Sequence, residues 1–230
     1  MDPRCTSPLP PDALRPLLER AGAVAMEAAG SPAQRKADRS YVTAADIEVG
    51  RMLTEACKEL VDAPVVQEEG EVRVQDGLRW VVDPIDGTTN FARGSTRWCV
   101  SIALCDGLRP LVGGVIQPAT GGLWVSTPGS IEPCPVEAWA LAGRLPKTPQ
   151  GMVELARRGR GSVRITGAAA LDLIDLARGQ LRQVLGFGLG EWDFMGAWAV
   201  LTARGGVLIP TRRAGRWDFV ATGATRPDRP

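Results

Sequence analysis

Residues 80–91 read WVVDPIDGTTNF, and this stretch decides both the expected fold and the expected chemistry. The apolar run Trp80–Val82 is typical of a short buried strand, which we expect to end at Asp83 because Pro84 forces the chain to turn. Asp86 follows three residues after Asp83, so the two carboxylates can converge on one point. Two oxygen anions held that close repel each other unless a cation lies between them, and Mg²⁺ prefers such hard ligands. The stretch therefore predicts a magnesium site.

The next residues, Gly87, Thr88 and Thr89, have the composition of a helix N-terminus. Unpaired N–H groups at such a terminus bind phosphate oxygens, so we predict that Gly87 and Thr88 bind phosphate. The alternative is a plain turn followed by a capping side chain, and for the Asp-Pro or Asp-Gly fragments alone that is the better interpretation. The complete stretch, placed after a buried strand, favours a site.

The composition excludes several mechanisms. The 230 residues are 44% hydrophobic and 23% charged, enough for one large domain or two tightly packed halves. The net charge of +1 gives no overall field for nucleic acid or a membrane, and we expect neither as a partner. Histidine is absent, which rules out Ser-His-Asp and Cys-His machinery. Any chemistry must rest on carboxylates, hydroxyls, amines, thiols or a hard metal ion.

The cysteines and the N-terminus predict a cytoplasmic protein. The five cysteines form no C-x-x-C pair and are odd in number, which favours reduced thiols over a disulfide framework or a zinc ribbon. Residues 1–11 are proline-rich without an apolar targeting segment, and no apolar run is long enough to span a bilayer.

Hydrophobic periodicity predicts alternating helices and strands around a boundary after residue 127. The segment 127–149 holds five prolines and two glycines, so we expect an N-terminal half (1–127) and a C-terminal half (128–230) in one compact unit. Mixed ordering of this kind favours layered helices and sheets. The expected helices are 12–29, 45–60, 168–178 and 192–204, and the expected strands are 80–82, 99–105, 111–116, 123–126, 181–187, 207–209 and 217–220.

Four further motifs follow in order along the chain. They are VTAAD at 42–46, EE at 68–69, GAAALD at 167–172 and EWD at 191–193 with Gly196-Ala197 after it. Together with residues 80–91 they resemble the signature of the inositol monophosphatase family of Mg²⁺-dependent, Li⁺-sensitive phosphatases, over roughly residues 14–220. The resemblance implies an α+β fold, a layered α/β/α/β/α sandwich with the site between its halves. It also implies a small-molecule phosphate ester as the substrate and a possible homodimer.

The resemblance also implies roles for individual residues. Two or three Mg²⁺ ions would bind, and a water activated by the first would attack the phosphorus directly. Thr88, hydrogen-bonded to Asp46, would orient that water. The implied first metal site consists of Glu68, Asp83 and the Ile85 carbonyl, the second of Asp83, Asp86 and Asp193; the catalytic residues would be Asp46, Thr88 and Glu68, and the substrate-binding residues Ala169 and Glu191.

Simpler interpretations exist for several of these residues. Glu68 and Glu69 could be a solvated acidic pair, while Asp46 and Asp193 could simply cap helices. Lys36, with its neighbour Arg35, is expected to be solvated, although one of the two could reach the site from a mobile loop.

The chain departs from the family pattern in ways that affect the substrate. The spacing from Glu68 to Asp83 is short, and the segment 127–149 is compressed. The family often places a substrate-binding acid a few residues before the Trp-Asp pair, whereas residues 185–190 here read LGFGLG. We therefore expect another ester than inositol 1-phosphate: a cyclitol, sugar, histidinol or nucleoside phosphate, with Arg93, Arg97 and Arg164 as candidate cations for a second phosphate.

Two alternatives stay open at this point. The first is a catalytically weak paralogue that binds metal or phosphate in a regulatory or structural role, which the trimmed loops suggest. The second is a cofactor enzyme of the Rossmann type, but Gly186, Gly188 and Gly190 lack the full G-x-G-x-x-G spacing within a βαβ unit.

Overall fold

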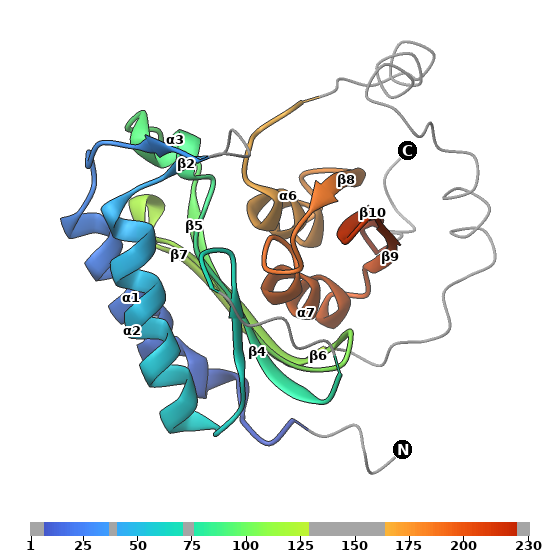
Figure 1. Cartoon of the computed structure of the whole chain (residues 1–230). Helices are drawn as coiled ribbons and strands as arrows, with labels where there is room; N and C mark the ends of the chain where they lie inside the picture. The colour runs from blue at the N-terminus through green and yellow to red at the C-terminus, as the bar shows by residue number, and fades with distance from the viewer. Residues whose placement is uncertain (1–6, 37–40, 71–75, 129–163, 225–230) are drawn as a thin grey trace.

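The computed structural model describes residues 7–36, 41–70, 76–128 and 164–224 (Figure 1). The elements before residue 128 are η2 (Pro11–Leu14), α1 (Arg15–Glu27), β1 (Gln34–Arg35), β2 (Tyr41–Val42), α2 (Ala44–Leu60), β3 (Val65–Gln67), β4 (Leu78–Asp86), α3 (Thr88–Ala92), β5 (Cys99–Asp106), β6 (Arg109–Gln117), η3 (Pro118–Thr120) and β7 (Gly122–Ser126). Those after it are α6 (Ala169–Ala177), β8 (Gln183–Leu189), α7 (Met195–Ala203), β9 (Val207–Arg213) and β10 (Arg216–Thr222).

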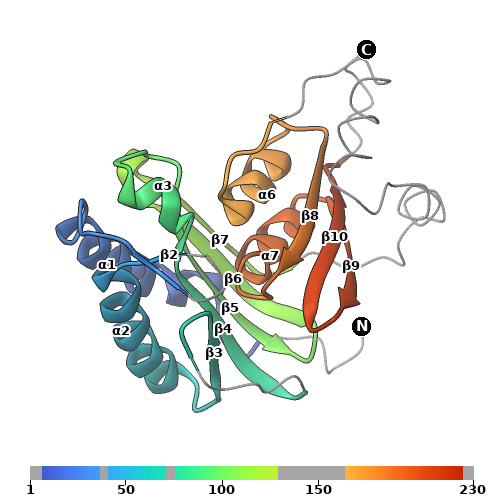
Figure 2. The same ribbon diagram turned by 45° about the horizontal axis from the view of Figure 1, so that its top comes forward.

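A five-stranded sheet in the order β3-β4-β5-β6-β7 forms the centre of the molecule. Strand β3 runs parallel to β4, and the other neighbours are antiparallel. Helices α1 and α2 lie on one face of this sheet, and α6 and α7 lie on the other (Figure 1). A three-stranded sheet in the order β8-β10-β9 lies beyond α6 and α7 (Figure 2).

This arrangement confirms the expected α+β sandwich. The layers run helix, sheet, helix, sheet, and no outer layer of helices is found within residues 7–36, 41–70, 76–128 and 164–224. Apart from its first two residues, the segment 127–149 lies outside the described residues, so the division at 127/128 stays a prediction.

Both faces of the central sheet are buried, and each face contributes to its own hydrophobic core. Alternate residues of β4 divide between them, because Trp80 and Val82 pack with α1 and α2 whereas Val81 packs with α6 and α7. In β5 the expected face of Val100, Ile102 and Leu104 is confirmed, since all three belong to the first core. The other face of β5 is buried as well, with Cys99, Ala103 and Cys105 in the second core and the small polar Ser101 between them.

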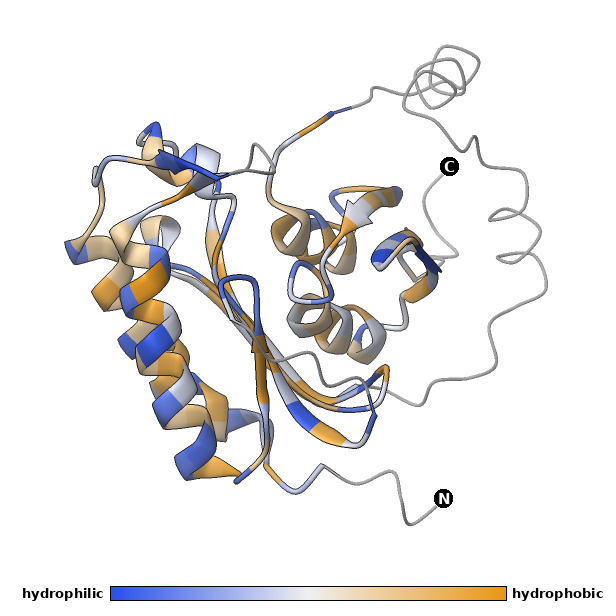
Figure 3. Cartoon of the chain, in the orientation of Figure 1, coloured by the Kyte–Doolittle hydropathy of each residue, from blue (hydrophilic) through white to orange (hydrophobic). Residues whose placement is uncertain are grey.

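Helix α7 is apolar on every side because it lies between the two sheets (Figure 3). Its backbone approaches the central sheet closely at Gly196. A Cβ atom there would lie 2.4 Å from Ser101 Oγ and 2.9 Å from the carbonyl oxygens of Ile102 and Gly114. The glycine after the Trp-Asp pair is therefore required by packing, and it lets the start of α7 lie directly against β5 and β6.

Candidate active site

An irregularity in β4 brings Asp83 and Asp86 to the same side. We expected the strand to end at Asp83, but this was wrong, because β4 continues through Pro84 to Asp86. Residues i and i+3 of a regular strand point to opposite faces. Asp83 lies opposite Ser101 and Asp86 opposite Cys99, so β4 carries one extra residue in this interval. A bulge of this kind accommodates a proline and also lets the two carboxylates converge.

Asp193 completes a cluster of three acids. Asp193 lies in the turn before α7, where the Gly190 N–H donates to Asp193 Oδ2 at 2.7 Å. The expected helix over 192–204 begins only at Met195, and no side chain caps it, so Asp193 is not a helix cap. Carboxylate oxygens of Asp83, Asp86 and Asp193 all lie within 4.8 Å of one another.

The electrostatics of this cluster suit a cation. Burial and the neighbouring carboxylates, Asp86 first among them, raise the pKa of Asp83 well above its usual range. Burial and the nearby Asp193 do the same for the pKa of Asp86, although backbone N–H groups of Ala170 and Ala169 oppose the shift. Burial raises the pKa of Asp193 to about 7. Three closely spaced carboxylates, two of them buried, form an oxygen donor set that a hard divalent cation would neutralise, so the residues fit Mg²⁺.

These shifts predict how the stability of the metal-free protein depends on pH. An acid with a raised folded-state pKa keeps its proton in the folded protein after the unfolded chain has released it, so stability falls as pH rises. For Asp193 the window runs from its ordinary value of 3.8 to about 7. We expect the free energy of unfolding in a chelator to decrease across this window, and Asp193→Asn to flatten the decrease. Urea unfolding at a series of pH values measures both; a wild-type curve that rises across the window contradicts the expectation.

The hydroxyl of Thr88 lies beside the cluster, at the start of α3. Gly87 has a φ of 90°, which favours glycine and turns the chain from β4 into the helix. Thr88 Oγ1 lies 3.2 Å from Asp46 Oδ1 and 3.1 Å from the Ile85 carbonyl oxygen. The expected pairing of Thr88 with Asp46 is thus present in the structure, and the Ile85 carbonyl is next to it.

Asp46 also caps α2, as the simpler interpretation of this residue expected. Thr43 N–H and Thr43 Oγ1 donate to Asp46 Oδ2 at 2.8 and 2.6 Å, and Asp46 N–H donates back to Thr43 Oγ1 at 3.4 Å. Burial raises the pKa of Asp46, and the Thr43 hydrogen bonds oppose the rise. One oxygen of Asp46 therefore fixes the helix start, and the other reaches Thr88.

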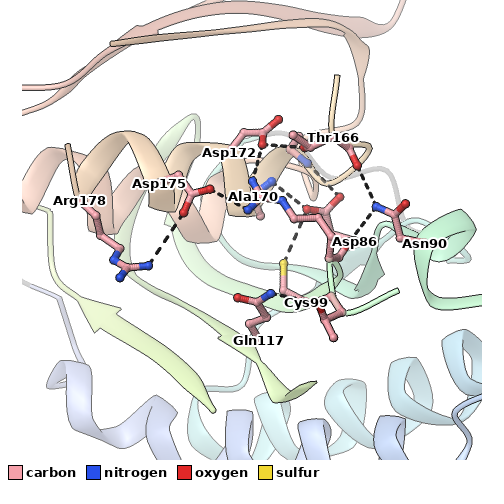
Figure 4. A network of polar contacts seen from close by, with 12 residues as sticks. Asp86, Asn90, Cys99, Gln117, Thr166, Ala170, Asp172, Asp175 and Arg178 are labelled. Carbon is pink, nitrogen blue, oxygen red and sulfur yellow. Dashed lines mark hydrogen bonds and ion pairs between the residues drawn. The ribbon is translucent and has the colours of Figure 1, made fainter. Parts of the chain in front are cut away.

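The N-terminus of α6 holds Asp86 in place (Figure 4). Asp86 Oδ1 accepts from Ala169 N–H at 3.3 Å, and Asp86 Oδ2 accepts from Ala170 N–H at 2.8 Å. The Cys99 thiol lies behind the same carboxylate, with Sγ 3.6 Å from Oδ2. Ala169, a predicted substrate-binding residue, thus directs its backbone N–H to an acid of the cluster.

Asn90 and Arg97 tie α3 and the loop after it to α6 and to the segment just before α6. Asn90 Nδ2 donates to the carbonyls of Arg97 and Thr166, at 2.8 and 2.9 Å. Arg97 donates to Asp172 and Asp175 on α6, at 2.6 and 2.7 Å. Arg97 was a candidate for binding a second phosphate, but its guanidinium is held by these two carboxylates, whereas Arg93 and Arg164 are exposed.

Glu68 lies near the cluster and is paired with a lysine. Lys36 Nζ donates to Glu68 Oε1 at 2.9 Å and also to Glu69, so our expectation of a solvated Lys36 was wrong. Burial raises the pKa of Glu68 and the Lys36 contacts oppose the rise. Glu68 raises the pKa of both Asp83 and Asp193, which places its charge close to theirs. A hollow of about 610 Å³ opens beside Asp46 and Glu69.

Glu191 does not face the cluster as a free acid. Glu191 Oε2 accepts from Arg79 Nη2 at 2.6 Å, and the side chain of Arg79 is fully buried. One of the two carboxylate oxygens of Glu191 is therefore engaged in a buried ion pair, and the predicted substrate-binding role of this residue stays a prediction. Sequence reasoning missed Arg79, since nothing in the motif indicates where its side chain points.

Comparison with known proteins places the chain in a family. The model of the inositol monophosphatase family matches residues 12–132 and 140–225. The inositol-1-monophosphatase ImpA of Mycolicibacterium smegmatis is 30% identical over 199 residues, 76% of this chain and 72% of that protein. The 3'(2'),5'-bisphosphate nucleotidase CysQ of Escherichia coli is 37% identical over 99 residues, 41% of this chain and 40% of that protein.

A solved structure gives the same fold. The IMPase of Thermotoga maritima has a TM-score of 0.73 at 22% identity, covering 92% of this chain and 91% of that one. Among the described residues, no helix is long and apolar enough to cross a membrane. The chain belongs to the inositol monophosphatase family, a family of phosphoric monoester hydrolases.

Proposed function

We propose that this protein is a Mg²⁺-dependent phosphomonoesterase that hydrolyses a small-molecule phosphate ester by direct attack of water. The observation that carries the proposal is the cluster of Asp83, Asp86 and Asp193 within 4.8 Å, next to the Thr88–Asp46 pair. The names of the relatives support it, since ImpA is called a monophosphatase and CysQ a nucleotidase. A cytoplasmic location and a homodimer stay predictions.

The oxygen donors form two groups of residues, each of which would bind one metal ion. Asp83, Asp86 and Asp193 would hold one ion; Glu68 and the Ile85 carbonyl would hold another with Asp83 shared between the two. When bound, Mg²⁺ would neutralise these acids, lower the pKa of an attacking water and stabilise charge on the leaving oxygen. Two or three ions is the number that the family resemblance implies. The Lys36–Glu68 ion pair would have to open for Glu68 to bind metal.

Thr88 and Asp46 would orient the attacking water. When Thr88 Oγ1 donates to Asp46 Oδ1, its lone pairs are left to accept a hydrogen bond from that water, and the water's proton could move to Oγ1 as the Thr88 proton moves to Asp46. The two Thr43 hydrogen bonds to Oδ2 hold the Asp46 carboxylate in place. Meanwhile the N–H groups of Ala169 and Ala170 hold Asp86. The start of α3, at Gly87 and Thr88, is the proposed place for a phosphate oxygen.

Thr88→Val tests this orienting role. We expect kcat to fall by about 10²- to 10⁴-fold, the usual contribution of positioned proton transfer. Mg²⁺ affinity should change little, because no proposed metal ligand belongs to the Thr88 side chain. Thr88→Ser is the matched control and should keep most of the activity. Steady-state kinetics with a Mg²⁺ titration separates the two effects, and full activity in Thr88→Val would refute the role.

The substrate is proposed to differ from inositol 1-phosphate because residues 185–190, which precede the Trp-Asp pair, carry no acid, and because one of them, Gly186, has no room for a side chain. A Cβ at Gly186 would lie 2.5 Å from a ring carbon of Phe219 and 2.6 Å from Leu189 Cδ1. Hydrophobic side chains thus fill the space into which a side chain at Gly186 would extend. The loss of a hydroxyl-binding carboxylate favours another alcohol phosphate.

Phosphate release from a panel of esters tests the proposal. The panel contains inositol 1-phosphate, sugar phosphates, histidinol phosphate, nucleoside monophosphates and a 3',5'-bisphosphorylated nucleoside. We expect Mg²⁺-dependent release that Li⁺ suppresses, with a best substrate other than inositol 1-phosphate. A strong preference for inositol 1-phosphate would overturn the substrate proposal alone. No release from any ester, by a folded protein that binds Mg²⁺, would favour the metal- or phosphate-binding paralogue.

A further inference from the structure

Arg79, the second residue of β4, is an arginine with no exposed surface. Its side-chain exposure is 0%, and it lies on β4 opposite Cys105 of β5. Nη2 donates to Glu191 Oε2 at 2.6 Å, and Nη1 donates to the Gly107 carbonyl. Nε has no hydrogen-bond partner among the described residues. A buried ion pair with an unpartnered nitrogen contributes little to stability compared with apolar side chains of the same volume.

Glu191 belongs to the short turn that carries Asp193. The Glu191 carbonyl accepts from the N–H groups of Phe194 and Met195 at 3.3 and 3.1 Å. Gly190 N–H closes the same turn on the Asp193 carboxylate. Because these bonds tie the turn together, a displacement of Glu191 would also displace Asp193.

Arg79 and Asp83 lie on the same face of β4. Residues two apart on a strand share a face, and Val81, between them, packs in the core with α6 and α7. The same strand therefore meets the same turn at two points: Arg79 meets Glu191, and Asp83 meets Asp193. The two points are about 13 Å apart along the strand.

We propose that Arg79 and Glu191 are a positioning pair that sets the distance between Asp83 and Asp193. The pair links the strand that supplies two acids of the cluster to the turn that supplies the third. Without it, the packing of Phe194 and Met195 in the core with Val81 would still hold the turn near β4, but nothing at Glu191 would oppose the repulsion between Asp83 and Asp193. This inference rests on the proposed function, since it assumes that the cluster binds Mg²⁺.

The experiment measures Mg²⁺ binding to the metal-free full-length chain by calorimetry, without substrate, with Mn²⁺ as a second probe. For Glu191→Gln we expect affinity to fall about 10- to 100-fold, as is usual when groups that orient metal ligands are changed.

A double variant separates positioning from folding. Removing one partner leaves an unpaired buried charge, whereas replacing both by apolar residues of similar volume is close to neutral for stability. We expect Arg79→Met with Glu191→Met to keep the wild-type Tm and still bind Mg²⁺ about 10- to 100-fold more weakly. The control is the exposed pair Asp12 and Arg15 at the start of α1, both changed to Met, which should leave Mg²⁺ affinity unchanged.

Each outcome decides the inference. Weaker Mg²⁺ binding in the folded double variant, with an unaltered control, supports a positioning pair. Wild-type affinity in Glu191→Gln and in the double variant, whatever their Tm, overturns it and leaves the proposed function standing. A wild-type chain that shows no saturable Mg²⁺ binding overturns the proposed function and the inference together.

Discussion

Asp83→Asn is expected to abolish phosphate release, with a loss of at least about 10³-fold in kcat/KM. Asp83 belongs to both proposed metal-binding groups, and a bound metal ion supplies several kcal/mol of transition-state stabilisation, about 10³-fold in rate. The substitution keeps the size of the side chain and removes its charge. Initial rates at several Mg²⁺ concentrations measure the effect.

The same substitution should stabilise the metal-free protein. Asp83 is 1% exposed and lies beside Asp86 and Asp193, so its neutral replacement relieves repulsion among buried acids. In a chelator we therefore expect Asp83→Asn to unfold at higher urea concentration than the wild type, and added Mg²⁺ to stabilise the wild type more than the variant. The exposed Asp62→Asn is the control and should behave as the wild type. If Asp83→Asn is instead less stable than the wild type in the chelator, Asp83 is not repelled by Asp86 and Asp193 in the metal-free protein.

The second large effect is expected at Gly196, on the stability of the fold. Gly196→Ala places a Cβ within 3.0 Å of Ser101 Oγ and of two backbone carbonyls on β5 and β6. Carbonyls of a central sheet cannot move aside as a flexible side chain can, so α7 must shift. We expect a loss of about 1–3 kcal/mol in the free energy of unfolding, as is usual for overpacked cores. Denaturant unfolding measures it through the transition midpoint.

A second helix glycine provides the matched control. At Gly50 in α2 a Cβ would meet Gln67 Oε1 at 2.5 Å and Pro84 Cγ at 3.1 Å. The amide of Gln67 can turn away, and alanine favours a helix over glycine by about 0.5–1 kcal/mol. Gly50→Ala should therefore be close to neutral. Equal losses in the two variants would contradict the packing explanation for Gly196.

The sequence predicted the fold class and most of the residues around the acid cluster, because the chemistry is concentrated in one stretch. Residues 80–91 contain Asp83, Asp86 and Thr88. The position of these side chains directly after an apolar strand already indicated a site. The bulge could not be predicted, since the sequence gives no register for β4 against β5. We did expect Asp83 and Asp86 to converge, but for the wrong reason. We expected a chain turn at Pro84, whereas the bulge in β4 brings both side chains to one side of the strand.

The side-chain partners of the charged residues were the part that sequence could not supply. Lys36 and Glu68 are 32 residues apart, and Arg79 and Glu191 are 112 apart, so each pair depends on how the layers pack. Local composition predicted a solvated Lys36, and the family resemblance implied a substrate-binding Glu191. Both side chains form ion pairs that only the tertiary structure could show.

The most direct test of the central claim is phosphate release by one preparation, first stripped with a chelator and then titrated with Mg²⁺. The claim predicts no release after stripping and a saturable return of activity with Mg²⁺, with Asp83→Asn inactive at every concentration. An undiminished rate in the chelator, or a rate in Asp83→Asn equal to that of the wild type, would contradict a metal-dependent phosphatase centred on Asp83, Asp86 and Asp193.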